Sequence, residues 1–140
     1  LGTVRGIETV TPALSDSKGS VVIISTTTAI ENGPGAGAYG AMKAALINLS
    51  SAKAQELAPQ GVNCNVVSPG PIYIEGGAWN FIKDNMEDFY KATLSAIPAG
   101  RMGAAQDVAN AVVFLGSPAA SYITGTNVVI DGGFTKGVHF

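Results

Sequence analysis

The sequence predicts an α/β protein with a parallel β-sheet that is covered by helices. Three short stretches rich in Val and Ile are typical of strands, and stretches with helical patterning separate them. Strands that alternate with helices over connections of this length form βαβ units, in which the strands run parallel. The apolar fraction of 46%, against 13% charged residues, supplies side chains to bury on both faces of such a sheet.

The N-terminal part is predicted to contain one helix and the first strand. Residues 1–14 carry apolar side chains at spacings of three and four, which predicts an amphipathic helix, and residues 15–19 form a polar turn. Residues 20–25 (SVVIIS) are a continuous β-branched run of the kind found in strands that are covered on both faces. A loop rich in Thr and Gly follows at 26–37.

A long helix and the second strand come next. Residues 38–58 are rich in Ala, Leu, Met and Lys, and they predict a helix that Pro59 and Gly61 end. Residues 62–68 predict the second strand. The Pro-Gly-Pro at 69–71 is expected to stop its hydrogen-bond ladder, because proline has no backbone N–H.

The C-terminal part is predicted to contain two helical regions and the third strand. The helical regions cover residues 76–97 and 105–116, and the strand covers 126–131. Three strands make a small sheet, and a bare apolar edge on the strand at 20–25 would favour aggregation. We therefore expect a further segment or chain to supply more strands.

Composition excludes several classes of protein. The chain has 8 basic and 10 acidic side chains and a net charge of −2, so we expect no nucleic-acid partner and no binding to an anionic membrane. No apolar run reaches the length of a membrane-spanning helix. The single Cys, Cys64, excludes an internal disulfide, and together with the single His, His139, it excludes a Cys/His zinc site. This Cys usage is typical of a cytoplasmic protein. We interpret Cys64 and Met102 as core residues and His139 as a tail residue.

The best local candidate for chemistry is the pair Tyr39 and Lys43 in the sequence YGAMK. Residues four apart on a helix share one face, so the phenol and the ammonium are expected to lie close together. A nearby cation and a helix N-terminus both favour negative charge, and a phenol in such a place can exchange a proton near neutral pH. The same spacing also fits a solvated Lys beside a partly buried Tyr.

Several motifs in order extend this pattern. They are VVIIST at 21–26, YGAMK at 39–43, NVVSPGPI at 65–72 and IPAGRMGAAQDVANAVVFLGSPAASYITGTNVVIDGG at 97–133. With these motifs, residues 1–140 resemble the C-terminal portion of a single domain of the short-chain dehydrogenase/reductase family. The resemblance implies a Rossmann-type, doubly wound parallel sheet. This chain would hold three of its strands with their flanking helices, and the N-terminal strands would be missing from it.

The resemblance implies roles for three residues in interconverting a carbonyl and a secondary alcohol. Tyr39 matches the catalytic acid/base, which gives a proton to the carbonyl oxygen in reduction and takes it back in oxidation. Lys43 matches the lysine that holds the nicotinamide ribose and makes the tyrosine more acidic. The hydroxyl that steadies the substrate oxygen belongs thirteen residues before the tyrosine, where this chain has Thr26 instead of the usual Ser. Ser25 is the alternative, but alternation along a strand sends its side chain to the opposite face.

The resemblance also implies an NAD or NADP cofactor and does not choose between the two. Residues 68–75 match the cofactor loop, in which Pro69, Gly70 and Ile72 would lie along the nicotinamide. Ile74 stands where the family often has a Thr whose hydroxyl contacts the cofactor, so one contact is lost. The plainer interpretation of this loop is a turn that ends a strand.

The remaining family segments concern the substrate. Residues 20–58 match the catalytic segment, and residues from about 74 to 98 match a mobile flap over the substrate. Apolar and aromatic residues at near-helical spacing in the flap favour an apolar or aromatic substrate, although each of them also fits ordinary core packing. These residues are Trp79, Ile82, Met86, Phe89 and Leu94.

Two further expectations concern the assembly. The family's glycine-rich phosphate turn, TGxxxGxG, does not occur in this sequence, so we expect the chain alone to be inactive and a missing N-terminal segment or chain to complete it. Family members pair the helix at 38–58 with its symmetry mate, which implies a homodimer or homotetramer. Small side chains that would permit a close approach of two such helices are Ala41, Ala44, Ala45, Ser50, Ser51 and Ala52.

A non-catalytic alternative stays open. The chain would then be a structural or regulatory subunit, or an inactive fragment, that keeps the fold and has lost cofactor binding. Ile74 favours this alternative, whereas the presence of both Tyr39 and Lys43 favours an enzyme. Lys43 also disfavours a resemblance to the halohydrin dehalogenases of this fold, whose pattern is Ser-Tyr-Arg and has no Lys at this place.

Overall fold

The computed structural model describes residues 2–33 and 36–137, and His139 therefore lies outside the described residues. The centre of the molecule is a three-stranded parallel sheet in the order β1 (Ser20–Ile24), β2 (Asn63–Pro69) and β5 (Asn127–Ile130). The predicted α/β class with a parallel sheet is confirmed.

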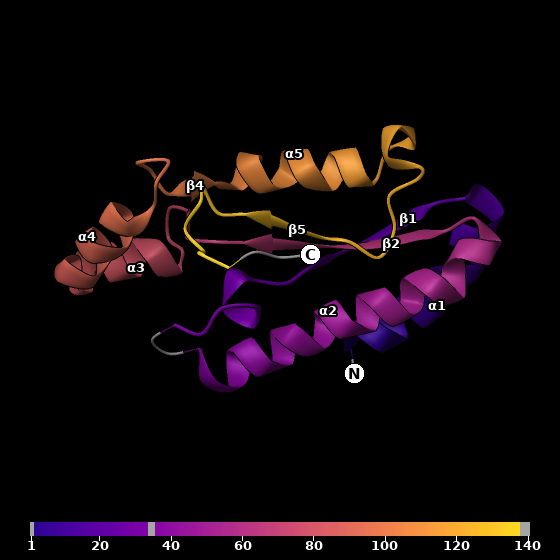
Figure 1. The fold of residues 1–140 in the computed structure, drawn as a ribbon, viewed down its shortest axis with the longest axis horizontal. Helices are drawn as coiled ribbons and strands as arrows, with labels where there is room; N and C mark the ends of the chain where they lie inside the picture. Colours follow the sequence, from indigo (N-terminus) through magenta and orange to yellow (C-terminus); the bar gives the residue numbers. More distant parts are fainter. Residues whose placement is uncertain (1, 34–35, 138–140) are drawn as a thin grey trace.

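Helices cover the sheet on both faces (Figure 1). The helices α1 (Gly2–Ser17) and α2 (Gly37–Leu57) lie on one face, and α5 (Ala105–Leu115) lies on the other. Two shorter helices, α3 (Ala78–Asn85) and α4 (Glu87–Ala96), pack together at the end of the sheet where the strands finish. This arrangement leaves the carboxyl ends of the strands next to several connecting loops, which is where ligands bind in open α/β sheets.

The smaller elements lie partly in those loops and partly at the opposite end of the sheet, before β2 and before β5. They are the 3₁₀ turns η1 (Thr27–Ala29), η2 (Ala58–Gln60) and η3 (Pro118–Ala120), and the strands β3 (Ile72–Tyr73) and β4 (Gly103–Ala104), which pair in parallel. The 3₁₀ turn η1 lies inside a stretch that the sequence predicts as loop, and Thr26 caps it by accepting a hydrogen bond from the Thr28 N–H.

The core has two halves, and β2 contributes to both of them. Cys64 and Val66 pack in the half that includes Leu57 of α2, while Val67 packs with Leu115 of α5 in the other half. Alternation along β2 produces this division. Leu57 and Leu115 are each 1% exposed, and burial of such a side chain contributes about 1.5–3 kcal/mol. Cys64 and Met102 are both buried, as expected of core residues.

The first helix is longer than predicted. It continues through the polar stretch and ends at Ser17, because Lys18 takes a left-handed conformation (φ 54°) and the Gly19 N–H then bonds the Leu14 carbonyl at 2.9 Å. The Ser17 hydroxyl donates to the Ala13 carbonyl within the last turn. The expected turn at 15–19 therefore shrinks to its last two residues.

The first strand is less covered than its β-branched run suggests. Ile23 is buried, but Ile24 is 42% exposed, because β1 forms one edge of the described sheet. The prediction of a strand covered on both faces is wrong for this end of β1.

Two further boundaries differ from the predictions. The region 76–97 is not one helix: it breaks at Met86, whose φ of −141° and ψ of 55° are not helical, and Glu87 and Asp88 then begin α4. The second strand, β2, begins and ends one residue later than predicted, and Pro69 is its last residue, paired with Ile130. The bond from the Gly70 N–H to the Ile130 carbonyl is the last one between β2 and β5, so the ladder ends within the Pro-Gly-Pro as expected.

None of the helices in the described ranges is both long enough and apolar enough to cross a bilayer.

Candidate active site

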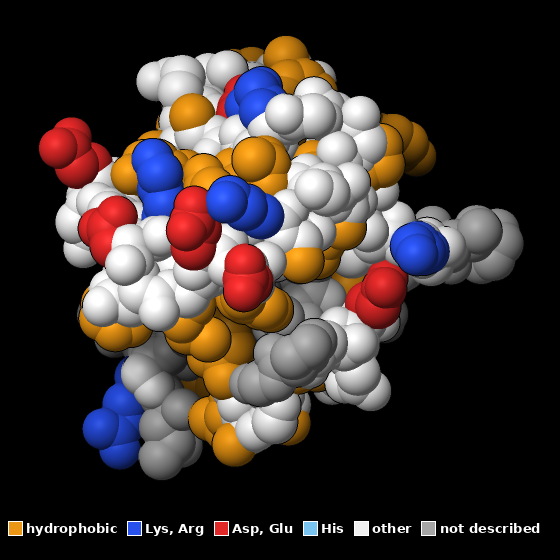
Figure 2. All heavy atoms as spheres, turned by 90° about the vertical axis from the view of Figure 1, so that its left-hand side faces the viewer, with side chains coloured by type: hydrophobic (Ala, Val, Ile, Leu, Met, Phe, Trp, Pro, Cys, Tyr) orange, Lys and Arg blue, Asp and Glu red, His pale blue; other side chains and the backbone are white. Residues whose placement is uncertain are grey.

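A cavity of about 630 Å³ lies at the carboxyl ends of the strands. Its walls come from the end of β1 with η1, the start of α2, the loop after β2, the starts of α3 and α5, and the chain after β5. Figure 2 looks onto this end of the molecule and shows hydrophobic side chains gathered in the lower centre, with acidic and basic side chains interspersed above them. The structure brings most of the sequence-predicted site residues to this cavity: Thr26, Tyr39, Pro69, Gly70, Ile72 and Ile74.

Tyr39 and Lys43 lie on one face of α2, near its N-terminus. The Tyr39 side chain is 57% exposed and lines the cavity. The Lys43 ammonium lies 5.9 Å from the centroid of the Tyr39 ring and donates a hydrogen bond of 2.9 Å to the Ile24 carbonyl. Lys43 is therefore held between β1 and α2, beside the cavity. The four-residue spacing places the two side chains together as expected for a helix.

The hydroxyl groups of Ser25 and Thr26 have different surroundings. Ser25 is 4% exposed, and its hydroxyl donates to the Lys43 carbonyl at 3.0 Å, so it joins β1 to α2. Thr26 is only partly buried, and its Oγ1 accepts hydrogen bonds from the N–H and the hydroxyl of Thr28. Because Thr26 accepts in both bonds, its own hydroxyl proton remains for an acceptor in the cavity.

The Pro69–Ile72 loop passes close to the chain that leaves β5. A Cβ on Gly70 would lie 2.5 Å from the Asp131 Cβ and 2.9 Å from its Cα, so the two backbones approach more closely than any other residue type would permit. Ile72 pairs with Gly103 in the small β3–β4 sheet, which holds the end of the loop. The loop is thereby fixed at the mouth of the cavity.

Replacing Gly70 with Ala is expected to destabilise the protein by about 1–3 kcal/mol, because the new methyl group overlaps the Asp131 backbone. Urea unfolding measures this change. Gly33→Ala is the control, because a Cβ on Gly33 meets nothing within 4 Å. Equal unfolding midpoints for the two variants would contradict the close approach.

The outer wall of the cavity is apolar. Trp79 at the start of α3 lines it and stacks on Phe89 of α4, with ring centroids 5.9 Å apart. Ile74 also lines the cavity and is 53% exposed. The break at Met86 permits this stack, because it folds α4 back onto α3.

A basic residue that the sequence does not single out connects the wall to β3. Lys83 of α3 lies 5.5 Å from the ring centroid of Tyr73 and 6.0 Å from that of Tyr90. A cation placed between two aromatic rings is attracted to both. Only the three-dimensional arrangement brings these rings from β3 and α4 to one side chain of α3.

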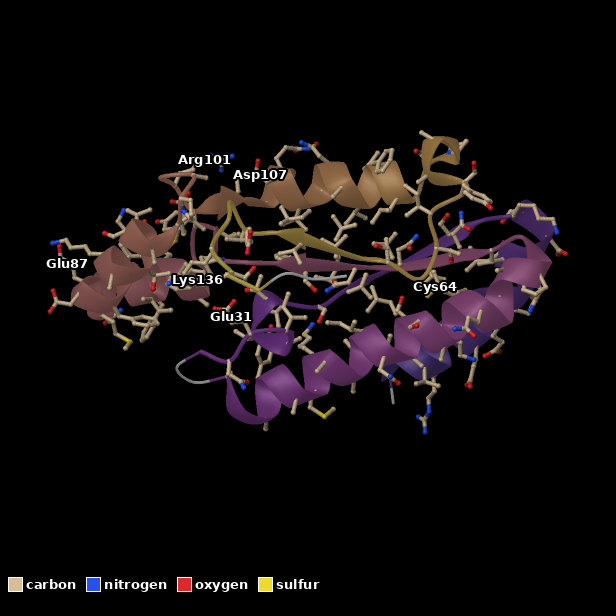
Figure 3. All side chains as sticks on the ribbon, in the orientation of Figure 1. Glu31, Cys64, Glu87, Arg101, Asp107 and Lys136 are labelled. Carbon is tan, nitrogen blue, oxygen red and sulfur yellow. The ribbon has the colours of Figure 1, made fainter. Side chains whose placement is uncertain are left out.

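An ion pair between Arg101 and Asp107 lies beside the small β3–β4 sheet. The Arg101 guanidinium makes two hydrogen bonds to the Asp107 carboxylate, of 2.7 and 3.1 Å, and Asp107 also accepts from the Ala104 N–H at the start of α5 (Figure 3). The bonds from Arg101 first, and the backbone bond second, lower the pKa of Asp107 from 3.8 to about 2. Asp107 thus caps α5 and ties it to the chain before β4.

This pair predicts a specific acid sensitivity. A carboxyl group whose pKa is lower in the folded than in the unfolded protein stabilises the fold above its unfolded pKa and loses that contribution as the pH falls toward its folded pKa. We expect the free energy of unfolding to fall between about pH 4 and about pH 2 by a smaller amount in Asp107→Asn than in the unmodified protein. Chemical denaturation across that range measures the difference, and parallel pH curves would contradict it.

One residue of the cavity wall lies far along the chain and was not predicted. Phe134, which follows the Asp-Gly-Gly turn, lines the same cavity as Thr26 and Tyr39. The turn itself is visible in the sequence, and both glycines have positive φ (64° and 84°). The direction in which it returns the chain is not visible in the sequence.

Comparison with known proteins finds relatives that are reductases and dehydrogenases. The family model described as enoyl-(acyl carrier protein) reductase matches residues 1–135. Isoepoxydon dehydrogenase of Aspergillus clavatus is 38% identical over 143 residues, which cover 100% of this chain and 55% of that protein. The 3-oxoacyl-[acyl-carrier-protein] reductase FabG of Escherichia coli is 38% identical over 115 residues, which cover 82% of this chain and 45% of that protein. The chain spans about half the length of the curated relatives it matches.

Solved structures agree with the fold. A short-chain type dehydrogenase/reductase from Mycobacterium ulcerans superposes with a TM-score of 0.86 at 33% identity, over 95% of this chain and 48% of that one. An NADPH-bound short-chain oxidoreductase from Pseudomonas aeruginosa superposes with a TM-score of 0.85 at 26% identity, over 96% of this chain and 53% of that one. The family model, the relatives and the shared fold lead to one conclusion: this chain belongs to the short-chain dehydrogenase/reductase family.

Proposed function

We propose that this chain carries the proton-transfer part of an NAD(P)-dependent oxidoreductase that interconverts a carbonyl and a secondary alcohol. The observation that carries the proposal is the convergence of the Tyr39 phenol and the Thr26 hydroxyl on one cavity, with the Lys43 ammonium 5.9 Å from the Tyr39 ring centroid. The names of the relatives, a dehydrogenase and a reductase, support the same class of reaction.

The cavity fits a nicotinamide and a small substrate together. Its volume of about 630 Å³ is within the range of small-molecule and cofactor sites. Pro69, Ile72 and Ile74 offer an apolar wall to a flat ring. Lys43 does not line the cavity itself, but its ammonium lies beside Tyr39 and would offer hydrogen bonds to ribose hydroxyls in addition to the bond it makes to the Ile24 carbonyl. When bound, the nicotinamide would supply or accept the hydride. An NADPH-bound neighbour among the solved structures supports this class of cofactor, and the choice between NAD and NADP stays open.

The chain's own residues would manage the substrate oxygen. Thr26 would donate its hydroxyl proton to that oxygen and so fix its position. Tyr39 would give its phenolic proton to the same oxygen in reduction and take it back in oxidation. Lys43 would compensate the negative charge that develops on the phenol oxygen as its proton leaves. Ser25, whose hydroxyl donates to the Lys43 carbonyl, would fix the end of β1 against α2 and so hold Thr26 close to Tyr39 and Lys43.

Two partners complete the proposal. The sequence contains no TGxxxGxG turn, so we place pyrophosphate binding on polypeptide outside these 140 residues. The same polypeptide would add strands to the sheet beside β1. A second copy of the chain would pack against α2, where Met42 is 68% exposed and Ala41 and Ala45 are exposed. Ser50 would not contribute, because it is buried and bonds the Cys64 thiol within the chain's own core at 3.5 Å.

The test uses the protein expressed from its complete gene. Titration with NADH and NADPH, followed by fluorescence, measures nucleotide binding, and consumption of the bound nucleotide in the presence of simple ketones measures turnover. We expect saturable binding of one nucleotide and turnover of at least one ketone. Binding without turnover, or no binding of either nucleotide, would support the non-catalytic subunit instead. Ile74 favours that alternative, because it lacks the hydroxyl that would contact the cofactor.

A further inference from the structure

We propose that Phe134 selects the substrate by forming an aromatic wall of the cavity, and that Glu31 and Asp131 are positioning residues that hold it there. The proposal rests on the proposed carbonyl chemistry of this cavity and deepens it, because it assigns a substrate class to a residue outside the Tyr39 and Lys43 motif. Three observations support it: the place of Phe134 in the cavity, and two separate attachments of the chain around it.

Phe134 is partly buried and shares the cavity with both candidate catalytic hydroxyl groups. Trp79 lines the same cavity. Two aromatic residues from elements far apart in the sequence therefore contribute to one binding space. An aromatic group in such a space gains contact area and ring–ring interactions that a small aliphatic group cannot make.

The first attachment lies at the root of the segment. The Asp131 carboxylate accepts hydrogen bonds from the Gly133 N–H at 2.9 Å, from the Thr135 N–H at 2.8 Å and from the Thr135 hydroxyl at 2.7 Å. The Phe134 N–H donates to the Asp131 carbonyl at 3.2 Å. The Gly132 carbonyl accepts from the Ala99 N–H at 3.0 Å, which joins the turn to the chain before β4. The backbone on both sides of Phe134 is thereby fixed.

The second attachment lies beyond Phe134. The Lys136 N–H donates to the Glu31 carboxylate at 2.9 Å, and Figure 3 shows Glu31 and Lys136 next to one another beside η1. Glu31 follows η1, the turn that Thr26 caps. The bond connects the segment that holds Phe134 to the loop that holds the Thr26 hydroxyl. A shift of one segment would therefore be transmitted to the other.

The test measures binding, so that it does not depend on turnover. Trp79 is the single Trp of this chain and lines the cavity, so its fluorescence reports ligands there. Acetophenone and acetone are titrated into the protein expressed from its complete gene, and Trp79→Phe shows which part of the signal comes from the cavity. We expect Phe134→Ala to raise the Kd for acetophenone about tenfold and to leave that for acetone nearly unchanged. Phe81→Ala, which removes an aromatic residue 63% exposed on α3, is the matched control and is expected to change neither.

The positioning role has its own readout. Glu31→Ala is expected to raise the Kd for acetophenone in the same direction but by a smaller factor than Phe134→Ala. Glu31→Gln is expected to restore the original Kd, because its amide oxygen still accepts from the Lys136 N–H. An unchanged acetophenone Kd in Phe134→Ala would overturn the proposal even if the protein reduces ketones. A shifted Kd in a protein that reduces no ketone would support the proposal and overturn only the proposed reaction.

Discussion

Tyr39→Phe is expected to lower carbonyl turnover by a factor of about 10² to 10⁴, the usual contribution of a positioned acid/base group. The substitution removes only the phenolic oxygen, and the ring keeps its place beside Lys43 at the start of α2. Because Tyr39 is 57% exposed, loss of its hydroxyl leaves no buried polar atom without a partner. The loss therefore belongs to proton transfer and not to folding. Steady-state kinetics with a saturating nucleotide measures it.

Tyr122→Phe is the matched control for this prediction. Tyr122 is fully exposed near η3 and does not line the cavity. The turnover of the Tyr122→Phe variant is therefore expected to equal that of the unmodified protein. Nucleotide binding is expected to persist in Tyr39→Phe, which separates a lost proton donor from a lost cofactor. Turnover in Tyr39→Phe within a factor of two of the unmodified protein would rule out Tyr39 as the acid/base.

Thr26 gives the second large effect, and two substitutions separate its hydroxyl from its methyl group. Thr26→Val keeps the branched shape and removes the donor, and we expect turnover to fall by a factor of about 10² to 10³, as when one preorganised donor to a reacting oxygen is lost. Thr26→Ser keeps the hydroxyl and is expected to retain most activity. The comparison of kcat between the two variants is the measurement.

Ser25 provides the test of the alternative assignment. Its hydroxyl is buried and bonded to the Lys43 carbonyl, so Ser25→Ala is expected to lower stability by about 0.5–1.5 kcal/mol. Its effect on turnover is expected to be smaller than that of Thr26→Val. The reverse order would assign the substrate-steadying hydroxyl to Ser25.

Local sequence patterns were sufficient for most of the fold. The Val- and Ile-rich runs and the Ala-rich helix predict each end of β1, β2, β5 and α2 to within one residue, because period and propensity act within a few residues of each position. The errors arise where contacts with residues distant in the sequence determine burial or the end of a helix. Ile24 is exposed because of the place of β1 in the sheet, and the break at Met86 occurs where α4 packs back on α3.

The candidate site divides in the same way. Tyr39 and Lys43 are related by helix geometry alone, so their spacing in the sequence was enough to place them together. Phe134 was not foreseen, because its position depends on hydrogen bonds that the carboxylates of Asp131 and Glu31 accept, and Glu31 lies 105 positions before its partner Lys136. That Gly70 lies along a nicotinamide stays a prediction, and its close approach to Asp131 is a contact that the sequence does not reveal.

The order of the strands has a consequence for how the protein is made. Ser20 pairs with Asn63, and Val66 pairs with Asn127, so each pairing closes a long stretch of chain. Contacts between such distant residues form slowly, and β2 keeps one unpaired apolar edge until β5 has been synthesised. The cavity gains its last wall later still, when Phe134 emerges. The half-made chain therefore exposes one edge of β2, the strand that is most buried in the finished fold, and this is the stage at which we expect a chaperone to be needed most.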